Sequence, residues 1–257
     1  MKKYFLCLMA IVGLMTSCSD NDKNVNPLAE QIIGKWIAVD YADEPALTDQ
    51  KVTLNFVSPT KCLVSMLLAD YEEVGGWANE VPFDVTIDGN VVTIAGKISE
   101  TISAIYEFHI LSINGDDMRC NIKITDFLNG VERHSELTGH FVRTNVDFNK
   151  DIIGTWEGIY WDGNAGKCRF EYLSDGTYNF YIHHTSTDTW VKSVDDYSYF
   201  SCQGNVLYMR WKNTGKDGIC ESWDITGIGN GTMTWSALRL DENDEPYVIS
   251  VGFTKVN

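Results

Sequence analysis

The chain has 257 residues, with 20 basic and 36 acidic side chains and a formal charge of −16. An acidic surface of this kind disfavours nucleic acid and anionic lipid headgroups, so we predict no nucleic-acid partner. Aromatic residues make up 12% of the chain. Together with frequent Asn, Asp and Gly punctuation, this content indicates an all-β protein.

Residues 1–17 have the pattern of a secretory signal peptide. Lys2 and Lys3 precede an apolar run from Tyr4 to Met15, which gives the basic start and short apolar region of such a peptide. The run is shorter than the roughly 20 residues that a membrane-spanning helix needs. We therefore expect this segment to be removed from the mature protein.

The residues around Cys18 resemble the lipobox of bacterial lipoproteins, with Met15, Thr16 and Ser17 directly before the cysteine. The resemblance implies cleavage before Cys18 and lipid attachment to it, because two or more acyl chains anchor a protein stably. An ordinary signal peptide with a coincidental cysteine is the alternative. Residues 18–27 are polar and end in a proline, which predicts a lipidated flexible tether.

Two acidic residues in this tether, Asp20 and Asp22, resemble the export tag of surface lipoproteins in certain Gram-negative anaerobes. The resemblance implies a protein that is lipid-anchored in the outer membrane and exposed at the cell surface. The membrane would then be one partner, through the anchor. The periplasmic face of the outer membrane is the alternative location.

The remainder of the chain is a tandem repeat. Three short motifs recur in the same order: Ile-Ile-Gly-x-Trp at 32–36 and 152–156, Gly-Asn-Val at 89–91 and 204–206, and Phe-x-basic at 141–143 and 253–255. The offset shrinks slowly along the chain, as a duplication with drifting loop lengths would produce. We predict two domains, residues 28–147 and 148–257.

Each repeat divides into eight short runs of strand-like composition. In the first they lie near 34–41, 51–57, 61–68, 82–88, 90–95, 104–113, 118–126 and 134–143; in the second near 154–161, 167–173, 177–184, 194–202, 205–212, 218–226, 232–240 and 246–255. Tight turn signals such as Asn230–Gly231 make consecutive strands antiparallel neighbours. We predict two eight-stranded antiparallel up-and-down barrels, because closure removes exposed edges. A β-sandwich is the structural alternative.

The Gly-x-Trp motifs at Trp36 and Trp156 resemble the start of the lipocalin family, and each repeat closes on a basic residue, Arg143 or Lys255. The resemblance implies that each tryptophan plugs the closed end of a barrel, with the basic side chain lying across its ring in a cation–π contact. The middle-strand motifs and C-terminal helix of secreted animal lipocalins are not evident. The chain looks more like the lipocalin-like domains of bacterial lipoproteins.

Five cysteines of the mature chain besides Cys18 lie inside apolar or alternating runs: Cys62, Cys120, Cys168, Cys202 and Cys220. They lack the close CxxC spacing of a zinc or redox site. We interpret them mainly as buried free thiols. One disulfide stays open, since an exported protein would permit it.

The two domains differ in their predicted interiors. Strand alternation gives domain one an aliphatic interior with residues such as Leu54, Val64 and Met66, and domain two a strongly aromatic one. The candidate ligand-binding residues all lie in domain two: Tyr160, Tyr172, Tyr178, Trp190, Trp211, Trp223 and Trp235.

Two interpretations of these aromatic residues stay open. A filled core is favoured somewhat, because an eight-stranded barrel is just wide enough for side chains to fill it. A ligand pocket lined by stacking rings is the other. Trp190 and Trp211 are predicted on the solvent side, where exposed tryptophan suits sugar stacking or partner docking.

Patterns typical of catalysis are weak in this sequence. His183 and His184 are adjacent, so on a strand they point to opposite faces and cannot share one ion. Neither a nucleophile elbow, nor a zinc-protease motif, nor a phosphate loop is present in the sequence. We predict no enzymatic activity, no metal and no cofactor.

The sequence thus favours a non-enzymatic lipoprotein that binds a small apolar molecule or a glycan through a lipocalin-like barrel, more readily through domain two. The first alternative is an envelope interaction or structural protein, in which filled barrels dock another envelope protein. The second alternative is an enzyme of unknown chemistry.

Overall fold

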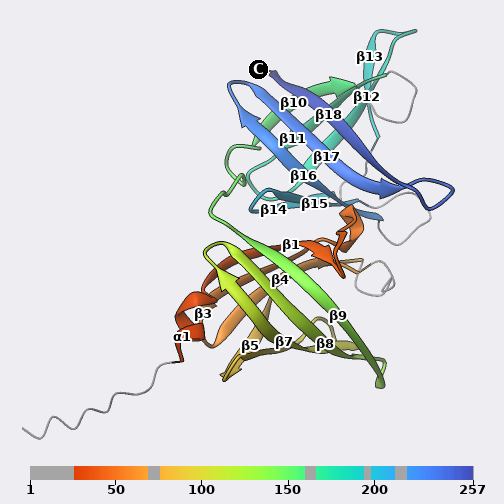
Figure 1. Cartoon of the computed structure of the whole chain (residues 1–257). Helices are drawn as coiled ribbons and strands as arrows, with labels where there is room; N and C mark the ends of the chain where they lie inside the picture. The colour runs from red at the N-terminus through yellow and green to blue at the C-terminus, as the bar shows by residue number, and fades with distance from the viewer. Residues whose placement is uncertain (1–25, 69–75, 160–165, 194–197, 212–218, 257) are drawn as a thin grey trace, which may run out of the picture.

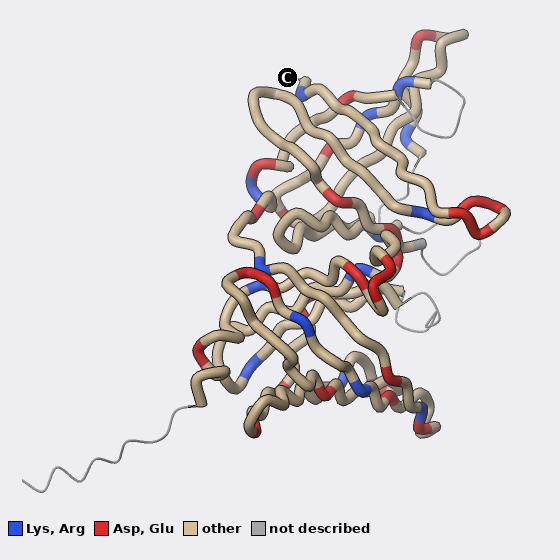
Figure 2. Tube along the Cα trace, viewed as in Figure 1, with Lys and Arg blue, Asp and Glu red and all other residues tan. Residues whose placement is uncertain are grey.

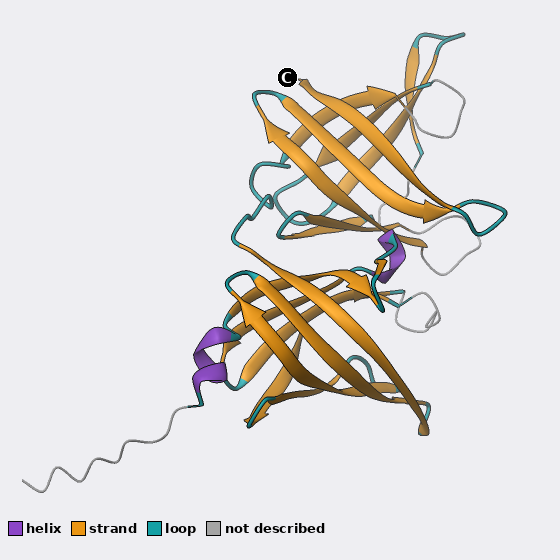
Figure 3. Cartoon of the chain, in the orientation of Figure 1, coloured by secondary structure: helices purple, strands orange, loops and turns teal. Residues whose placement is uncertain are grey.

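The computed structural model describes residues 26–68, 76–159, 166–193, 198–211 and 219–256. Cys18 and residues 1–17, the predicted signal peptide, lie outside the described residues. The described chain is all-β apart from the short helix α1 (Pro27–Gln31) and the 3₁₀ turn η1 (Thr48–Gln50). Figures 1 and 3 show two β-domains with η1 between them. The prediction of an all-β chain is confirmed.

The strands of domain one are β1 (Gly34–Tyr41), β2 (Glu44–Pro45), β3 (Val52–Ser58), β4 (Lys61–Leu67), β5 (Trp77–Asp88), β6 (Val91–Lys97), β7 (Ile102–Asn114), β8 (Asp117–Leu128) and β9 (Val131–Thr144). Apart from the two-residue β2, each pairs with the next in sequence, and β9 pairs back onto β1. Domain one is therefore a closed eight-stranded antiparallel barrel, as the sequence predicted.

The strands of domain two are β10 (Gly154–Ile159), β11 (Lys167–Tyr172), β12 (Tyr178–His184), β13 (Thr189–Lys192), β14 (Tyr199–Gln203), β15 (Val206–Trp211), β16 (Ile219–Gly229), β17 (Thr232–Leu240) and β18 (Pro246–Val256). They form one sheet in the order β13-β12-β11-β10-β18-β17-β16-β15-β14. β13 lies between the strands predicted near 177–184 and 194–202.

The prediction of a second closed barrel is wrong, because domain two is a curled half-barrel. The described parts of its edge strands β13 and β14 form no ladder with each other. Among the described residues, one isolated bridge, between Thr177 just before β12 and Tyr199 on β14, links the two halves of the sheet. β13 pairs with β12 from Tyr181 to His184. β13 therefore occupies the backbone N–H and C=O groups of β12 with which β14 would have to pair to close a barrel.

The first strand of each domain, β1 or β10, carries a buried tryptophan. Trp36 and Trp156 are 0 and 1% exposed. Each indole N–H donates to the backbone carbonyl four residues earlier, at 2.7 Å to Ile32 and 2.6 Å to Ile152. The motif therefore closes one end of each domain with an aromatic ring whose polar atom is satisfied.

A basic side chain covers each of these rings. Arg143 Cζ lies 4.4 Å from the ring centroid of Trp36, and Lys255 Nζ lies 5.0 Å from that of Trp156. The preceding glycines, Gly34 and Gly154, have φ of +125° and +127°. A Cβ there would meet Arg143 Cδ at 3.3 Å or Lys255 Cε at 2.7 Å, so glycine suits both the backbone and the approach of the cation.

The two domains pack against each other through the outer faces of their sheets. Ile37, Val206 and Tyr208 form a separate apolar cluster there, flanked by Leu67 and Trp77. Val206 and Tyr208 are 0% exposed. β14 to β16 therefore bury their inner face in the core of domain two and their outer face against domain one.

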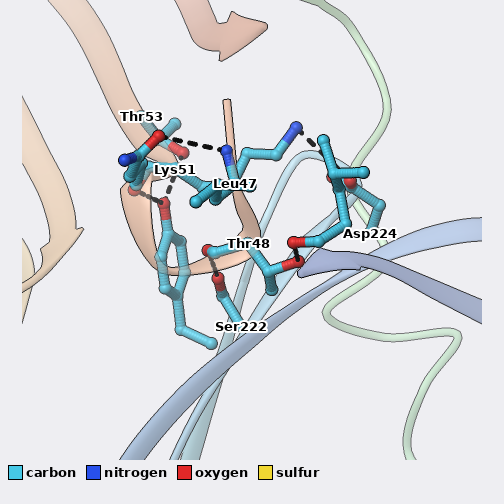
Figure 4. Close-up of polar contacts among 9 residues, drawn as sticks. Leu47, Thr48, Lys51, Thr53, Ser222 and Asp224 are labelled. Atoms are coloured by element: carbon cyan, nitrogen blue, oxygen red, sulfur yellow. Dashed lines mark hydrogen bonds and ion pairs between the residues drawn. The ribbon is translucent and has the colours of Figure 1, made fainter. Parts of the chain in front are cut away.

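Polar contacts surround this cluster, and Figure 4 shows several of them. The hydroxyl of Tyr208 lies 3.2 Å from Thr53 Oγ1 and 3.1 Å from the carbonyl of Lys51. Lys51 Nζ also pairs with a carboxylate oxygen of Asp224 at 3.3 Å. The hydroxyl of Ser222 donates to the carbonyl of Thr48. These contacts fix β3 and η1 against β15 and β16.

Candidate ligand-binding site

The predicted pocket residues in the interior of domain two are packed core. Tyr172, Tyr178, Trp223 and Trp235 are between 0 and 4% exposed. Their rings contact one another and neighbouring aromatic rings in a continuous set, for example Trp235 with Phe253 at 4.4 Å between centroids. The space inside the half-barrel is thus occupied by protein side chains, which is the filled-core interpretation.

Two other predicted residues lie at the margin of domain two, where the partly buried Trp211 packs against the same core. Trp190 lies on β13 under the guanidinium of Arg169, 4.2 Å from the ring centroid, and its ring is 5.0 Å from that of His183. Trp211, at the end of β15, lies between the domains, in a groove that also includes Arg239. Tyr160 lies outside the described residues. The seven predicted residues therefore form no single site in the described structure.

An apolar cavity lies instead inside the barrel of domain one. Its volume is about 130 Å³, and its lining comes from six strands: Tyr41, Val52, Leu54, Val64, Met66, Tyr106, Phe108, Ile122, Ile124, Leu137 and Phe141. The sequence analysis placed the candidate ligand-binding residues in domain two, whereas this cavity lies in domain one. The physical reason is side-chain volume, because aliphatic residues leave space that the large rings of domain two fill.

The cavity runs from a buried floor to a half-buried rim. Leu54, Val64 and Phe141 at the floor are 2% exposed or less. Tyr41, Tyr106 and Leu137 at the rim are partly exposed. The rim therefore lies toward the end of the barrel opposite to Trp36, where an up-and-down barrel can admit a ligand.

Two tyrosine hydroxyls are the polar groups of this lining. Tyr106 Oη lies 3.9 Å from Met66 Sδ, and Tyr41 Oη donates at 3.4 Å to the carbonyl of Gln50. Burial raises the pKa of Tyr106 to about 12, and burial also raises the pKa of Tyr41. Both phenols are therefore neutral at physiological pH, and the cavity carries no charge of its own.

A wider groove lies beside the rim of the cavity, in the space between the domains. We call it the mouth groove; its volume is about 930 Å³, and it is lined by Tyr41, Glu44, Pro45, Leu47, Gln50, Leu137, Leu238, Leu240, Asp244 and Pro246. Tyr41 and Leu137 line both the cavity and the mouth groove. The two spaces are thus adjacent across these two side chains.

Sequence reasoning missed this site for a specific reason. It placed Leu54, Val64 and Met66 in the interior of domain one, and all three line the cavity. The useful signal was the small volume of these residues compared with their counterparts in domain two. No sequence pattern indicated the mouth groove, because its walls come from both domains.

Other kinds of site find little support in the part of the chain that is described. His, Cys, Asp and Glu residues form no group of three or more there that could hold a metal ion. Cys62, Cys120, Cys168 and Cys202 are buried free thiols. No helix among the described residues has the length and apolar character needed to cross a membrane.

The chain is distantly similar to several solved bacterial structures. It resembles a "putative outer membrane protein" from Bacteroides fragilis at 11% identity, covering 89% of this chain and 99% of that one, with a TM-score of 0.21. A Xanthomonas type IV secretion system related protein matches at 14% identity over 61% of this chain and 92% of its own, with a TM-score of 0.17.

A third similar structure is a double mutant of transferrin binding protein B from Haemophilus parasuis. The identity is 7%, the match covers 83% of this chain and 61% of that one, and the TM-score is 0.23. The chain matches no protein-family model and no curated protein. Its function must therefore be argued from its own residues.

Proposed function

We propose that this chain is a non-enzymatic binding protein that takes up an apolar group through the open end of the barrel of domain one. The cavity between Leu54, Val64 and Phe141 carries the proposal. Its lining is almost wholly apolar, as small-molecule sites usually are. Domain two, with its packed interior, supports one wall of the mouth groove.

The proposal includes the cellular location predicted from the sequence: a lipoprotein anchored in the outer membrane through Cys18 and exposed at the cell surface. The pattern from Met15 to Cys18 supports it. Metabolic labelling with a fatty acid tests the anchor, since a Cys18→Ala variant should lose the label and leave the membrane fraction. Label retained by that variant would contradict it.

The binding proposal predicts that decan-1-ol, a neutral amphiphile, binds in the cavity. Val64 is 0% exposed and lines the cavity floor, so Val64→Phe should fill the space and weaken binding roughly tenfold or more. Ile124→Trp should weaken binding in the same way. Because Ile124 lies at the half-buried rim, the larger side chain should disturb the packing of the core less. Calorimetric titration measures both.

The matched control is Val57→Phe, which makes the same change at a side chain that is 51% exposed. It should bind decan-1-ol like the parent protein. Thermal unfolding identifies any variant that has failed to fold. Binding that is absent in the parent protein, or unchanged in both cavity variants, would overturn the proposed function.

A further inference from the structure

The size of the cavity limits how much of a ligand it can hold. Its volume of about 130 Å³ is well below the roughly 300–1,000 Å³ of sites that enclose a whole small molecule. It is close to the ~150 Å³ of an engineered cavity that holds one benzene ring. Only the end of a larger ligand fits inside, so the rest must lie in the mouth groove.

The walls of the mouth groove are apolar. Leu47, Leu137, Leu238 and Leu240 line it together with the rings of Tyr41, Pro45 and Pro246. Leu240 is 43% exposed. An apolar chain that leaves the cavity past Tyr41 and Leu137 would therefore remain in contact with apolar side chains on both domains.

The charged side chains that line this groove are acidic. Glu44, on β2, and Asp244, in the turn between β17 and β18, both line it and are exposed. Among the described residues of its lining, no side chain is basic. Glu44 is the direct cross-strand neighbour of Tyr41, which places a carboxylate one residue pair from the entrance of the cavity.

The turn that carries Asp244 is ordered by its own hydrogen bonds. The carboxylate of Asp241 accepts the backbone N–H groups of Asn243 at 2.7 Å and Glu245 at 3.0 Å. These bonds lower the pKa of Asp241. Figure 2 shows this acidic turn projecting on the same side of the molecule as the acidic residues near η1.

We infer that the ligand is an amphiphilic cation: a molecule with one apolar chain, whose end enters the barrel of domain one, and a positively charged head that lies between Glu44 and Asp244. This inference rests on the proposed function and adds the charge of the ligand. The cavity and the apolar walls of the mouth groove select the chain. The carboxylates of Glu44 and Asp244 select the head by charge complementarity.

Three amphiphiles that share a ten-carbon chain, used at monomeric concentrations, separate binding of the chain from selection of a positive head: decyltrimethylammonium, decan-1-ol and decanoate. We expect affinity to fall in that order, with the cation binding roughly fivefold or more tighter than the alcohol, since exposed ion pairs contribute modestly. Added salt should narrow this difference, because exposed charges are screened. Calorimetry on the full chain measures all three.

Two double variants test whether the preference for the cation comes from Glu44 and Asp244. Glu44→Gln combined with Asp244→Asn should reduce binding of decyltrimethylammonium to about the level of decan-1-ol and leave the alcohol unchanged. Asp84→Asn combined with Asp88→Asn is the matched control, because both are exposed acids on β5 and the change in net charge is the same. The control should keep the preference for the cation.

The possible results are distinguishable. If decan-1-ol binds and Val64→Phe abolishes its binding, but the cation binds no tighter, the inference fails and the proposed function stands. If the control pair also removes the preference for the cation, the effect comes from net charge, and the proposed head site between Glu44 and Asp244 is wrong. If neither the alcohol nor the cation binds, or Val64→Phe and Ile124→Trp change nothing, the proposed function fails and the inference with it.

Discussion

Trp36 and Trp156 occupy the same place in their respective domains, and their surroundings show what each residue contributes. Each ring is buried, donates one hydrogen bond to a carbonyl, and lies under a cation. The cations also bond to the backbone: a guanidinium N–H of Arg143 donates to Gln31 O at 2.5 Å, and Lys255 Nζ donates to Ile153 O at 2.8 Å. The ring and the cation together hold the lead segment against the barrel end.

We predict that Trp36→Ala and Trp156→Ala each destabilise the protein by about 3–5 kcal/mol, the usual cost of truncating a buried aromatic side chain. Arg143→Ala and Lys255→Ala should cost less, because a partly exposed cation–π contact contributes about 0.5–1 kcal/mol. Chemical denaturation of the four variants measures the free energy of unfolding. Losses near 1 kcal/mol for the tryptophans, the centre of the general mutational distribution, would contradict a closing role.

Among the elements, β13 decides the architecture of the second domain. β13 pairs with the second half of β12. Only the start of β12 and the residue before it remain next to β14, through the bridge of Thr177 and Tyr199 and the bond from Tyr178 N to Ser198 O. In the first domain β9 instead runs alongside β1 from Thr144 to Gly139 and closes the barrel. The two repeats thus share strand order and the closing motif but differ in which backbone edges find a partner.

A histidine reinforces the β1–β9 seam that closes the first barrel. His140, on β9, places Nδ1 2.6 Å from a carboxylate oxygen of Asp40 on β1 and Nε2 2.6 Å from one of Asp117 on β8. The imidazole therefore bridges three neighbouring strands close to the bulge of β1 between Ala38 and Asp40. The corresponding position in the second repeat is Gly252, so this bridge belongs to the closed barrel.

For the whole molecule, the interface around Tyr208 joins the two domains through buried contacts. It combines the buried cluster of Ile37, Val206 and Tyr208 with the ion pair of Lys51 and Asp224. The linker is tied down as well, since the side chain of Asn149 exchanges hydrogen bonds with the backbone of Cys202 at 2.7 and 3.0 Å. These contacts also hold the two walls of the mouth groove at a set separation.

We predict that the parent protein unfolds in one thermal transition and that Val206→Asp unfolds in two. Val206 is 0% exposed, and an unpaired carboxylate cannot remain buried there without a large desolvation cost. The interface should therefore separate before either domain unfolds. Differential scanning calorimetry resolves the transitions.

The control for this variant is Val248→Asp, which introduces the same charge at a side chain of domain two that is 65% exposed. It should keep the single transition. Two separate transitions in the parent protein would show that the domains unfold independently and that the interface contributes little. A Val206→Asp variant with one unchanged transition would show that burial of Val206 contributes little to holding the domains together.

The sequence by itself determined the local features of this protein. Alternation with a period of two, turn residues such as Gly89 and Gly231, and the recurring Gly-x-Trp motif are short-range properties, and each can be read along the chain. They predicted the all-β class, most of the strands and the closed first barrel. The interior residues of domain one were also recognisable, because burial on a strand follows from parity.

Only the tertiary structure decided closure of the second sheet and the position of the site. Closure depends on which distant edges pair, and β13 competes for the edge of β12 over a few backbone hydrogen bonds. The cavity volume is a small difference between the space inside the barrel and the side chains that many strands contribute to it. The walls of the mouth groove come from both domains. Glu44 and Asp244, 200 positions apart in the chain, line the same groove only because the two domains pack together.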